Sequence, residues 1–174
     1  MDILLILMVV FCLLISLTAF VSIFYRVPYV PTSRRVIDKI FSTIKLKKGN
    51  KFVDLGCGDG RMLQEAEKRA KADGTGYEIA PLVYLMALCK KIVSGSKYKI
   101  HYKNFFKDKL DYADVIFCYL MPFQLKKLSN KIQKECKKGT VIVSNTFKIE
   151  GMRPKKIIPK NIPEKTPSLY IYQI

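Results

Sequence analysis

The sequence predicts an α/β protein in which one transmembrane helix precedes a doubly wound, mostly parallel sheet that ends in an antiparallel hairpin. Three observations predict this class. Residues 3–24 are mostly apolar, without a charge or a proline. Strand-like and helix-like runs then alternate as far as residue 147, and two strand-like runs without a helix between them end the chain. Such alternation is typical of a parallel sheet with helices on both faces.

The apolar run Ile3–Phe24 contains 22 residues without a charge or a proline. As a helix it would be about 33 Å long, slightly more than the hydrocarbon core of a bilayer requires. A secretory signal peptide needs a basic first region and a shorter apolar core, whereas the basic residues here follow the run, beginning at Arg26. The positive-inside rule therefore predicts a single-pass membrane anchor, residues 1–26, with residues 27–174 on the cytoplasmic side.

A linker punctuated by prolines, YRVPYVPTSRR, follows the anchor. The residue before each proline is disfavoured in a helix, so the linker is expected to run extended. Thr32 or Ser33 is then a candidate N-cap for a helix whose apolar residues recur at helical spacing. These apolar residues are Val36, Ile37, Ile40, Phe41 and Ile44.

The remaining chain predicts a Rossmann-like order of strands and helices. Strands are expected at residues 51–56, 74–79, 98–105, 113–120 and 140–147. Helices are expected between them at residues 60–72, 80–95 and 122–139. Asp73-Gly74 would end the first of these helices and Gly95 the second. Near the C-terminus, the strand-like segments 155–161 and 168–174 fit a terminal antiparallel hairpin.

The stretch NKFVDLGCGDGR places three glycines, Gly56, Gly58 and Gly60, where a strand passes into a helix. A dinucleotide-binding turn requires G-x-G-x-x-G, and its third glycine position is occupied here by Arg61. The glycines allow a ligand to approach the backbone closely, but their spacing suits a ligand without a pyrophosphate. Glu78, at the end of the second strand, can accept hydrogen bonds from both hydroxyls of a ribose. The site therefore predicts an adenosine-like ligand that lacks phosphates.

VDLGCGDG followed by GYE resembles the first motif and the acidic end of the second strand in class I S-adenosylmethionine-dependent methyltransferases. More narrowly, PYVPT, DLGCGDGR, YE, VIFCYLMP and VSNTF resemble a membrane-anchored group of lysine methyltransferases. That group includes the mitochondrial enzymes for the adenine nucleotide translocase and for the ATP synthase c-subunit, with many short prokaryotic relatives. The resemblance covers residues 28–174, and it departs from the group at Ala80, where the pattern has asparagine.

The resemblance implies S-adenosyl-L-methionine as the cofactor and a set of residues that bind it. The implied cofactor-binding residues are Thr32, Asp54, Gly56, Cys57, Gly58, Gly60, Glu78, Asn104 and Tyr119. Asp54 and the glycines would hold the methionine portion, partly through backbone amides, Glu78 the ribose and Asn104 the adenine. The implied catalytic residues, which would border the methyl-transfer site after the fourth and fifth strands, are Tyr119, Pro122, Asn145 and Phe147.

Each of these residues also has a purely structural interpretation, and the sequence leaves it open. Asn104 and Asn145 are also typical turn or cap residues. Tyr119 and Phe147 have the size and polarity of core aromatics. Thr32 can be explained as a helix cap alone.

The resemblance further implies that the methyl acceptor is a lysine of a membrane protein. An apolar slot built by Tyr119 and Phe147 would disfavour the ammonium form and so ease the loss of its proton. The alternatives are a methyltransferase for a lipid, a quinone, another small molecule or RNA, and a non-catalytic module that binds the cofactor.

Charge and cysteine content indicate which partners to expect. Residues 27–174 hold 30 basic and 13 acidic residues, so the whole formal charge of +17 lies beyond the anchor. Anionic lipid headgroups attract such a domain; nucleic acid is the less favoured partner because no added RNA-binding module is evident. One histidine and five scattered cysteines supply too few ligands for a zinc or iron–sulfur site, so no metal is expected.

Overall fold

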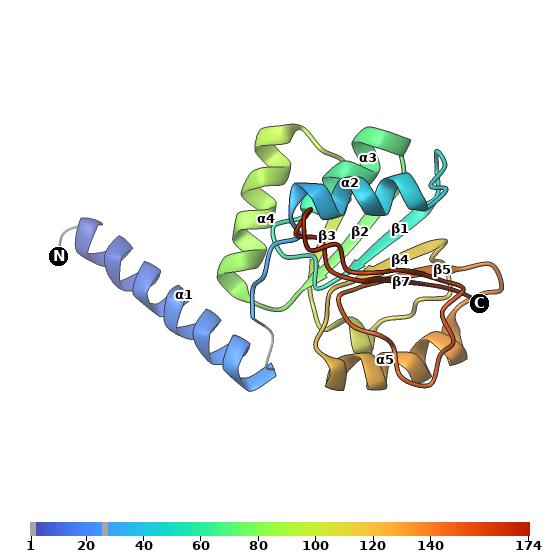
Figure 1. Ribbon diagram of the computed structural model, residues 1–174. Helices are drawn as coiled ribbons and strands as arrows, with labels where there is room; N and C mark the ends of the chain where they lie inside the picture. Colours follow the sequence, from blue (N-terminus) through green and yellow to red (C-terminus); the bar gives the residue numbers. More distant parts are fainter. Residues whose placement is uncertain (1–2, 26–27) are drawn as a thin grey trace.

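The structure is a computed structural model that describes residues 3–25 and 28–174 (Figure 1). Within these residues, seven strands form one sheet in the order β3-β2-β1-β4-β5-β7-β6. The strands are β1 (Lys51–Leu55), β2 (Asp73–Glu78), β3 (Lys99–Tyr102), β4 (Val115–Cys118), β5 (Val141–Asn145), β6 (Lys156–Ile158) and β7 (Leu169–Gln173). Strands β1 to β5 run parallel, and β7 is antiparallel to both β5 and β6. The predicted doubly wound sheet with a C-terminal hairpin is confirmed.

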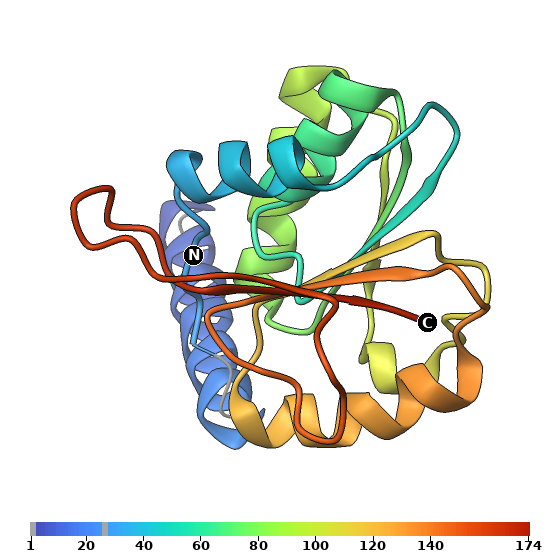
Figure 2. The same cartoon turned by 45° about the vertical axis from the view of Figure 1, so that its right-hand side comes forward.

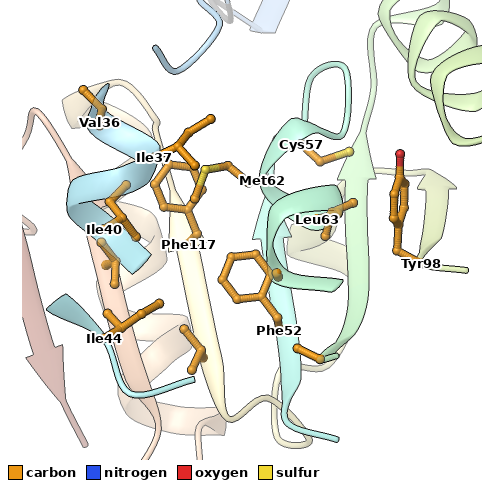
Figure 3. Packing of buried hydrophobic residues seen from close by; sticks show 14 of the residues in the cluster. Val36, Ile37, Ile40, Ile44, Phe52, Cys57, Met62, Leu63, Tyr98 and Phe117 are labelled. Carbon is orange, nitrogen blue, oxygen red and sulfur yellow. The ribbon is translucent and has the colours of Figure 1, made fainter. Parts of the chain in front are cut away.

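Helices cover both faces of this sheet (Figure 2). They are α2 (Arg34–Thr43), α3 (Arg61–Ala70), α4 (Pro81–Ser94), α5 (Pro122–Glu135) and the short 3-10 helix η1 (Phe105–Lys107). Helices α2, α3 and α4 pack on one face, and α5 packs on the other with η1. Adjacent strand residues supply the two cores in turn: Phe117 faces the first and Ile116 the second, as the two-residue period of a strand requires. In Figure 3, Ile37 and Ile40 of α2 lie against Phe117.

Helix α1 (Ile3–Tyr25) is long and apolar enough to cross a membrane, although a signal sequence would satisfy the same criteria. The helix lies beside the sheet domain, next to α4 (Figure 1). The Thr18 hydroxyl accepts a hydrogen bond from the backbone N–H of Leu82, 3.0 Å away. This bond satisfies one of the free N–H groups in the first turn of α4. The predicted boundary between anchor and domain, at residues 26 and 27, lies outside the described residues.

The predicted end of helix α3 and the predicted start of strand β2 were wrong. Helix α3 ends at Ala70, with Lys71 as a left-handed C-cap at φ 51°, so Asp73-Gly74 does not end it. Asp73 instead begins β2, where it pairs with Lys51 of β1. A side chain on Gly74 would lie only 3.0 Å from the Cβ atom of Tyr98, so this glycine serves close packing and not a turn.

Candidate functional site

The glycine turn between β1 and α3 depends on glycine for its conformation. Gly56, Gly58 and Gly60 have φ values of +80°, +56° and +76°, in the left-handed region that favours glycine. The N–H groups of Gly56 and Cys57 both donate to the carbonyl of Tyr77, at 3.0 and 2.9 Å. These bonds hold the turn against the end of β2.

Most N–H groups of the turn are hydrogen-bonded within the protein. The N–H of Gly58 donates to the Glu78 carboxylate at 3.0 Å, and that of Gly60 donates to the carbonyl of Cys57 at 2.9 Å. Four of the five N–H groups of residues 56–60 are thus used within the protein in this conformation, and within the described part of the chain that of Asp59 is the exception. Space and oxygen acceptors remain, and these suit a cationic ligand better than a phosphate.

Two small cavities lie where the strand order reverses, between β1 and β4. They measure about 60 and 50 Å³ and share three lining residues, Gly56, Glu78 and Leu120. They are thus two parts of one cleft, at the place where open parallel sheets bind ligands. The first part is bounded by the glycine turn and by residues 28–32, called the strap from here on, and the second by Tyr25 and the start of η1.

Arg61 fixes the strap over the cleft. Its Nη1 donates to the carbonyl oxygen of Thr32 at 3.0 Å, while Nε and Nη2 donate to the Asp59 carboxylate at 2.9 Å each. Lys90 donates to the same carboxylate at 2.9 Å. Burial alone would raise the pKa of Asp59, but Arg61 and Lys90 outweigh it and lower the pKa. Arg61, which occupies the third glycine position of the dinucleotide-binding pattern, thus binds the strap to the domain.

Tyr29 of the strap covers the glycine turn directly. A Cβ atom at Gly58 would lie 3.0 Å from the Cε2 atom of the Tyr29 ring, so only glycine allows this ring to lie so close. Burial, together with the negative charge of Asp59, raises the pKa of Tyr29. The sequence predictions assigned no binding role to Tyr29, Arg61 or Tyr25, and Arg61 was noted only because it replaces a glycine of the dinucleotide-binding pattern. The local signals were the tyrosine in PYVPT and the arginine after the third glycine.

Glu78 is a buried carboxylate whose hydrogen bonds fix its position. Besides Gly58, the N–H groups of Ile79 and Ala80 donate to it at 2.8 and 2.9 Å. Burial raises the pKa of Glu78, and the three hydrogen bonds oppose that rise without cancelling it. Ala80 contributes through its backbone, so the departure from asparagine at this position leaves the contact intact.

Asp54 is a buried carboxylate of the cleft with an unsatisfied oxygen atom. It is 1% exposed, and its Oδ1 atom has no hydrogen-bond partner in the described part of the chain. Burial raises the pKa of Asp54 well above its usual value, and the charges of Glu78 and Asp59 add to this. A buried acceptor without a partner is costly, and a ligand ammonium group would supply the missing donor. S-adenosylmethionine carries such an ammonium, a positive sulfonium and two ribose hydroxyls, so its donors fit these acceptors.

The structure brings together most of the predicted cofactor residues. The first part of the cleft is lined by Thr32, Asp54, Gly56, Cys57, Gly58, Glu78 and Tyr119. Asn104 lines the second part, where its side chain also accepts from the N–H of Phe106 at 3.0 Å and caps η1. Gly60 is absent from the lining of either part and is the N-cap of α3.

The predicted catalytic residues do not gather in the same way. Tyr119 borders the cleft, but Pro122, Asn145 and Phe147 are not among its lining residues. Pro122 begins α5, and Asn145 is the buried last residue of β5.

In residues 3–25 and 28–174, no group of three or more His, Cys, Asp or Glu side chains could hold a metal ion.

Tyr119 and Phe147 do not form the predicted aromatic slot, because their rings pack on opposite faces of the sheet. Tyr119 packs against the core under α2 and α3, and Phe147 against the core under α5. The strand was expected to continue to residue 147, but it ends at Asn145, and Thr146 adopts φ +70°. This left-handed residue interrupts the two-residue alternation, so Phe147 turns to the face opposite the one the strand pattern predicted.

Sequence comparison gives a family match and two curated relatives. Residues 54–156 match the model of the ANTKMT methyltransferase domain family. A protein-lysine N-methyltransferase of Saccharolobus islandicus is 32% identical, over 86% of this chain and 94% of the relative. The mouse adenine nucleotide translocase lysine N-methyltransferase is 30% identical over 76% of this chain, which covers 58% of the mouse protein.

Solved structures share the fold. An RNA methyltransferase of Salinibacter ruber in complex with S-adenosyl-L-homocysteine has a TM-score of 0.77 and 25% identity, covering 83% of this chain and 94% of that one. A methyltransferase of Geobacter sulfurreducens with the same ligand has a TM-score of 0.60 and 16% identity, covering 84% and 57%. The acceptor-rich cleft and these matches agree that S-adenosylmethionine is the cofactor. The chain is an S-adenosylmethionine-dependent methyltransferase and belongs to the ANTKMT methyltransferase domain family.

Proposed function

We propose that this enzyme methylates a lysine side chain of a membrane protein, and that α1 anchors it with the catalytic domain at the cytoplasmic face. The observation that carries the proposal is the buried, unpaired Asp54 carboxylate, which together with Glu78 forms a site for a cationic nucleoside. That cleft belongs to a chain whose two curated relatives are both named as lysine N-methyltransferases.

The protein's part in the reaction is chiefly alignment. The cofactor, when bound, supplies a methyl group on a positive sulfonium, and the methyl passes to the acceptor nitrogen as the N–C bond forms and the S–C bond breaks. Asp54 would accept the ammonium group and Glu78 the ribose hydroxyls, with Asn104 beside the adenine. Tyr119 and Leu120 border the cleft on the side of β4, where the acceptor would enter.

A lysine acceptor must first lose a proton. At an ordinary pKa of about 10.4, deprotonation at pH 7 costs about 4.6 kcal/mol. Phe117, Leu120 and the ring of Tyr119 give this side of the cleft an apolar border, and such a border disfavours the ammonium form. The released proton goes to water before the amine reaches the methyl group.

The membrane part of the proposal rests on α1 and on charge. The helix contains no charged residue, and its described residues are at least partly exposed. The first cations after it that the structure describes are Arg34, Arg35 and Lys39, which favour a cytoplasmic position for the domain. The mouse relative is named for a translocase, and this supports a membrane-protein acceptor.

RNA is the second candidate acceptor. The Salinibacter ruber structure is described as an RNA methyltransferase, and the formal charge of +17 would also attract a polyanion. The lysine proposal is preferred because both curated relatives are lysine methyltransferases, whereas the charge suits lipid and RNA equally.

A labelling experiment separates these acceptors. The purified full-length protein is incubated with cell membranes, total RNA and S-adenosylmethionine labelled in the methyl group, and protein, lipid and RNA are then separated. We expect the label in membrane protein, recovered as methyl-lysine after hydrolysis, and its loss with Glu78→Ala. Label confined to RNA or lipid would overturn the proposed acceptor.

A further inference from the structure

A separate groove adjoins the cofactor cleft. It has a volume of about 570 Å³ and lies between Thr146, at the end of β5, and residues 159–168, which join β6 to β7. Tyr119 lines both this groove and the cleft, so the two hollows meet at that side chain. Residues 159–168, called the hairpin loop from here on, project from the end of the sheet (Figure 2).

The hairpin loop has fixed internal bonding. The N–H groups of Asn161 and Thr166 each donate to the other's carbonyl at 3.0 Å. The N–H of Thr146 donates to the carbonyl of Ser168 at 2.8 Å, which ties the loop to the end of β5. Arg35 of α2 donates to the carbonyl of Glu164 at 3.3 Å. Hydrogen bonds therefore hold the hairpin loop, which forms one side of the groove, in a defined conformation.

Thr146 forms the floor where this wall meets the sheet. Its φ of +70° is unusual for a residue other than glycine, and such a conformation costs about 1–2 kcal/mol. Residues held in this way tend to lie at ligand sites. Thr146 lines the groove beside Tyr119, and its hydroxyl lies 3.3 Å from the Asn145 amide oxygen.

The groove is both basic and apolar. Lys160 and Lys165 line it, are exposed, and form no ion pair with a carboxylate within residues 3–25 and 28–174. Ile162 is 74% exposed at the loop tip, and Pro167 lies further along the same wall. Glu164, the acid of the hairpin loop, lines a second hollow with Lys39 and does not line the groove, whereas Lys160, Ile162 and Thr166 line both.

We propose that this groove binds the polypeptide around the acceptor lysine and selects a lysine that is flanked by acidic and apolar residues. Lys160 and Lys165 bind the flanking carboxylates, and Ile162 and Pro167 contact the apolar neighbours. The acceptor side chain then passes Tyr119 into the cleft. This inference rests on the proposed lysine methylation and names the acceptor sequence that the site takes.

An extended peptide suits this groove better than RNA does. Recognition of a single-stranded nucleic acid relies on aromatic side chains that stack on successive bases, and Tyr119 is the one aromatic residue among those that line the groove. Two separated ammonium groups beside exposed aliphatic side chains match a mixed acidic and apolar peptide.

Two peptides and two sets of variants test the proposal with the full-length enzyme. One peptide carries glutamate on both sides of a lysine, and the other carries glutamine at the same positions. The groove variant is Lys160→Gln with Lys165→Gln. The matched control is Lys68→Gln with Lys71→Gln, two exposed lysines at the C-terminal end of α3 that do not line the groove. The readouts are KM for each peptide, peptide binding by fluorescence anisotropy, and the Kd for S-adenosylhomocysteine.

We expect the wild-type enzyme to favour the glutamate peptide in KM by about tenfold, which corresponds to about 1.4 kcal/mol. The groove variant should lose this preference and keep its Kd for S-adenosylhomocysteine, whereas the control variant should keep both. Lys160→Glu with Lys165→Glu should reverse the preference in favour of the glutamine peptide.

Each contrary outcome identifies what fails. Methylation of both peptides with equal KM, or a preference that survives in the groove variant, would overturn the groove assignment and leave lysine methylation standing. Label that reaches RNA and neither peptide would overturn the proposed function and the groove assignment together. Competition by RNA that depends on Lys160 and Lys165, without any flank preference, would show that the groove holds nucleic acid.

Discussion

Asp54 and Glu78 lie near the carboxyl ends of two neighbouring parallel strands, and both are buried. Glu78 is held by three backbone N–H groups, whereas Asp54 has one oxygen without a partner. Burial raises the pKa of each, so each binds its proton more firmly than an exposed acid does. A cationic ligand would favour the ionised forms of both carboxyl groups, so its binding would stabilise the protein.

Replacing Glu78 tests its role as the ribose acceptor. We expect Glu78→Gln to weaken binding of S-adenosylhomocysteine by about 10- to 100-fold, because hydrogen bonds to a charged group contribute about 1.5–3 kcal/mol. Isothermal titration calorimetry measures the change. Asp73→Asn, at the exposed start of the same strand, is the matched control and should bind normally. Unchanged affinity in Glu78→Gln would remove this residue from the site.

The raised pKa values of Asp54 and Glu78 also predict a pH dependence. A carboxyl group whose folded-state pKa is raised stabilises the free protein at low pH, and this contribution is lost as the pH rises through the folded-state pKa. Ligand binding needs the ionised form, so affinity should fall as the pH is lowered through the raised pKa values, above the ordinary carboxyl range of about 4.

Calorimetry of S-adenosylhomocysteine over a range of pH, in buffers of different ionisation enthalpy, should show that binding releases protons at mildly acidic pH. Asp54→Asn should release fewer protons, and should raise the melting temperature of the free protein at neutral pH. Affinity that does not change with pH would contradict the assignment of these acids to the ligand.

The strap and the glycine turn together determine access to the cleft. The two parts of the cleft measure about 60 and 50 Å³, whereas small-molecule sites are usually about 300 Å³ or larger. We therefore expect the strap to move outward when the cofactor binds. Arg61 restrains that movement through its hydrogen bond to the Thr32 carbonyl.

Loss of this restraint should be visible in the kinetics of binding. We expect Arg61→Gln to raise the dissociation rate of S-adenosylhomocysteine by about tenfold, since it removes a charged hydrogen bond from the closed strap. Surface plasmon resonance gives both rates. Arg69→Gln is the matched control, because Arg69 lies on the same helix but pairs with Glu65 and Asp38, away from the cleft. Equal dissociation rates for Arg61→Gln and the wild type would show that the strap does not limit release.

The elements that the sequence predicted well are those with strong local signals. The alternation of strands and helices along the chain, the hairpin and the position of Glu78 follow from periodicity and spacing, and the glycine turn follows from its need for positive φ. Arg61 and Tyr29 were missed because the strap contacts the turn through a bond that joins residues 29 positions apart. The aromatic slot was wrong because the left-handed Thr146 changes the face on which Phe147 lies, and no local pattern marks that conformation.

At the scale of the whole molecule, α1 is attached to the catalytic domain by more than the linker. It packs along α4, and Tyr25 at its end lines the second part of the cleft. If α1 crosses a membrane, the cleft lies next to the bilayer surface, within reach of a segment that emerges from a membrane protein.

Native cysteines can report the topology. Cys89 is exposed on α4, and Cys12 is exposed on α1. In sealed vesicles of known orientation, we expect a membrane-impermeant maleimide to label Cys89 only from the cytoplasmic side. It should leave Cys12 unlabelled, since the proposed anchor places that residue in lipid. Cys89→Ala should abolish the labelling. Labelling of Cys89 from the opposite side would contradict the proposed orientation.

The central claim, methylation of lysine in a membrane protein, is tested most directly by mass spectrometry of membranes from cells with and without this enzyme. The account predicts a methyl-lysine on the cytoplasmic side of a membrane protein that is lost with the enzyme. The modification should be restored by the wild-type chain and not by Glu78→Gln. Membrane proteins whose lysine methylation is the same in both cell lines, together with an RNA methyl group that disappears with the enzyme, would contradict it.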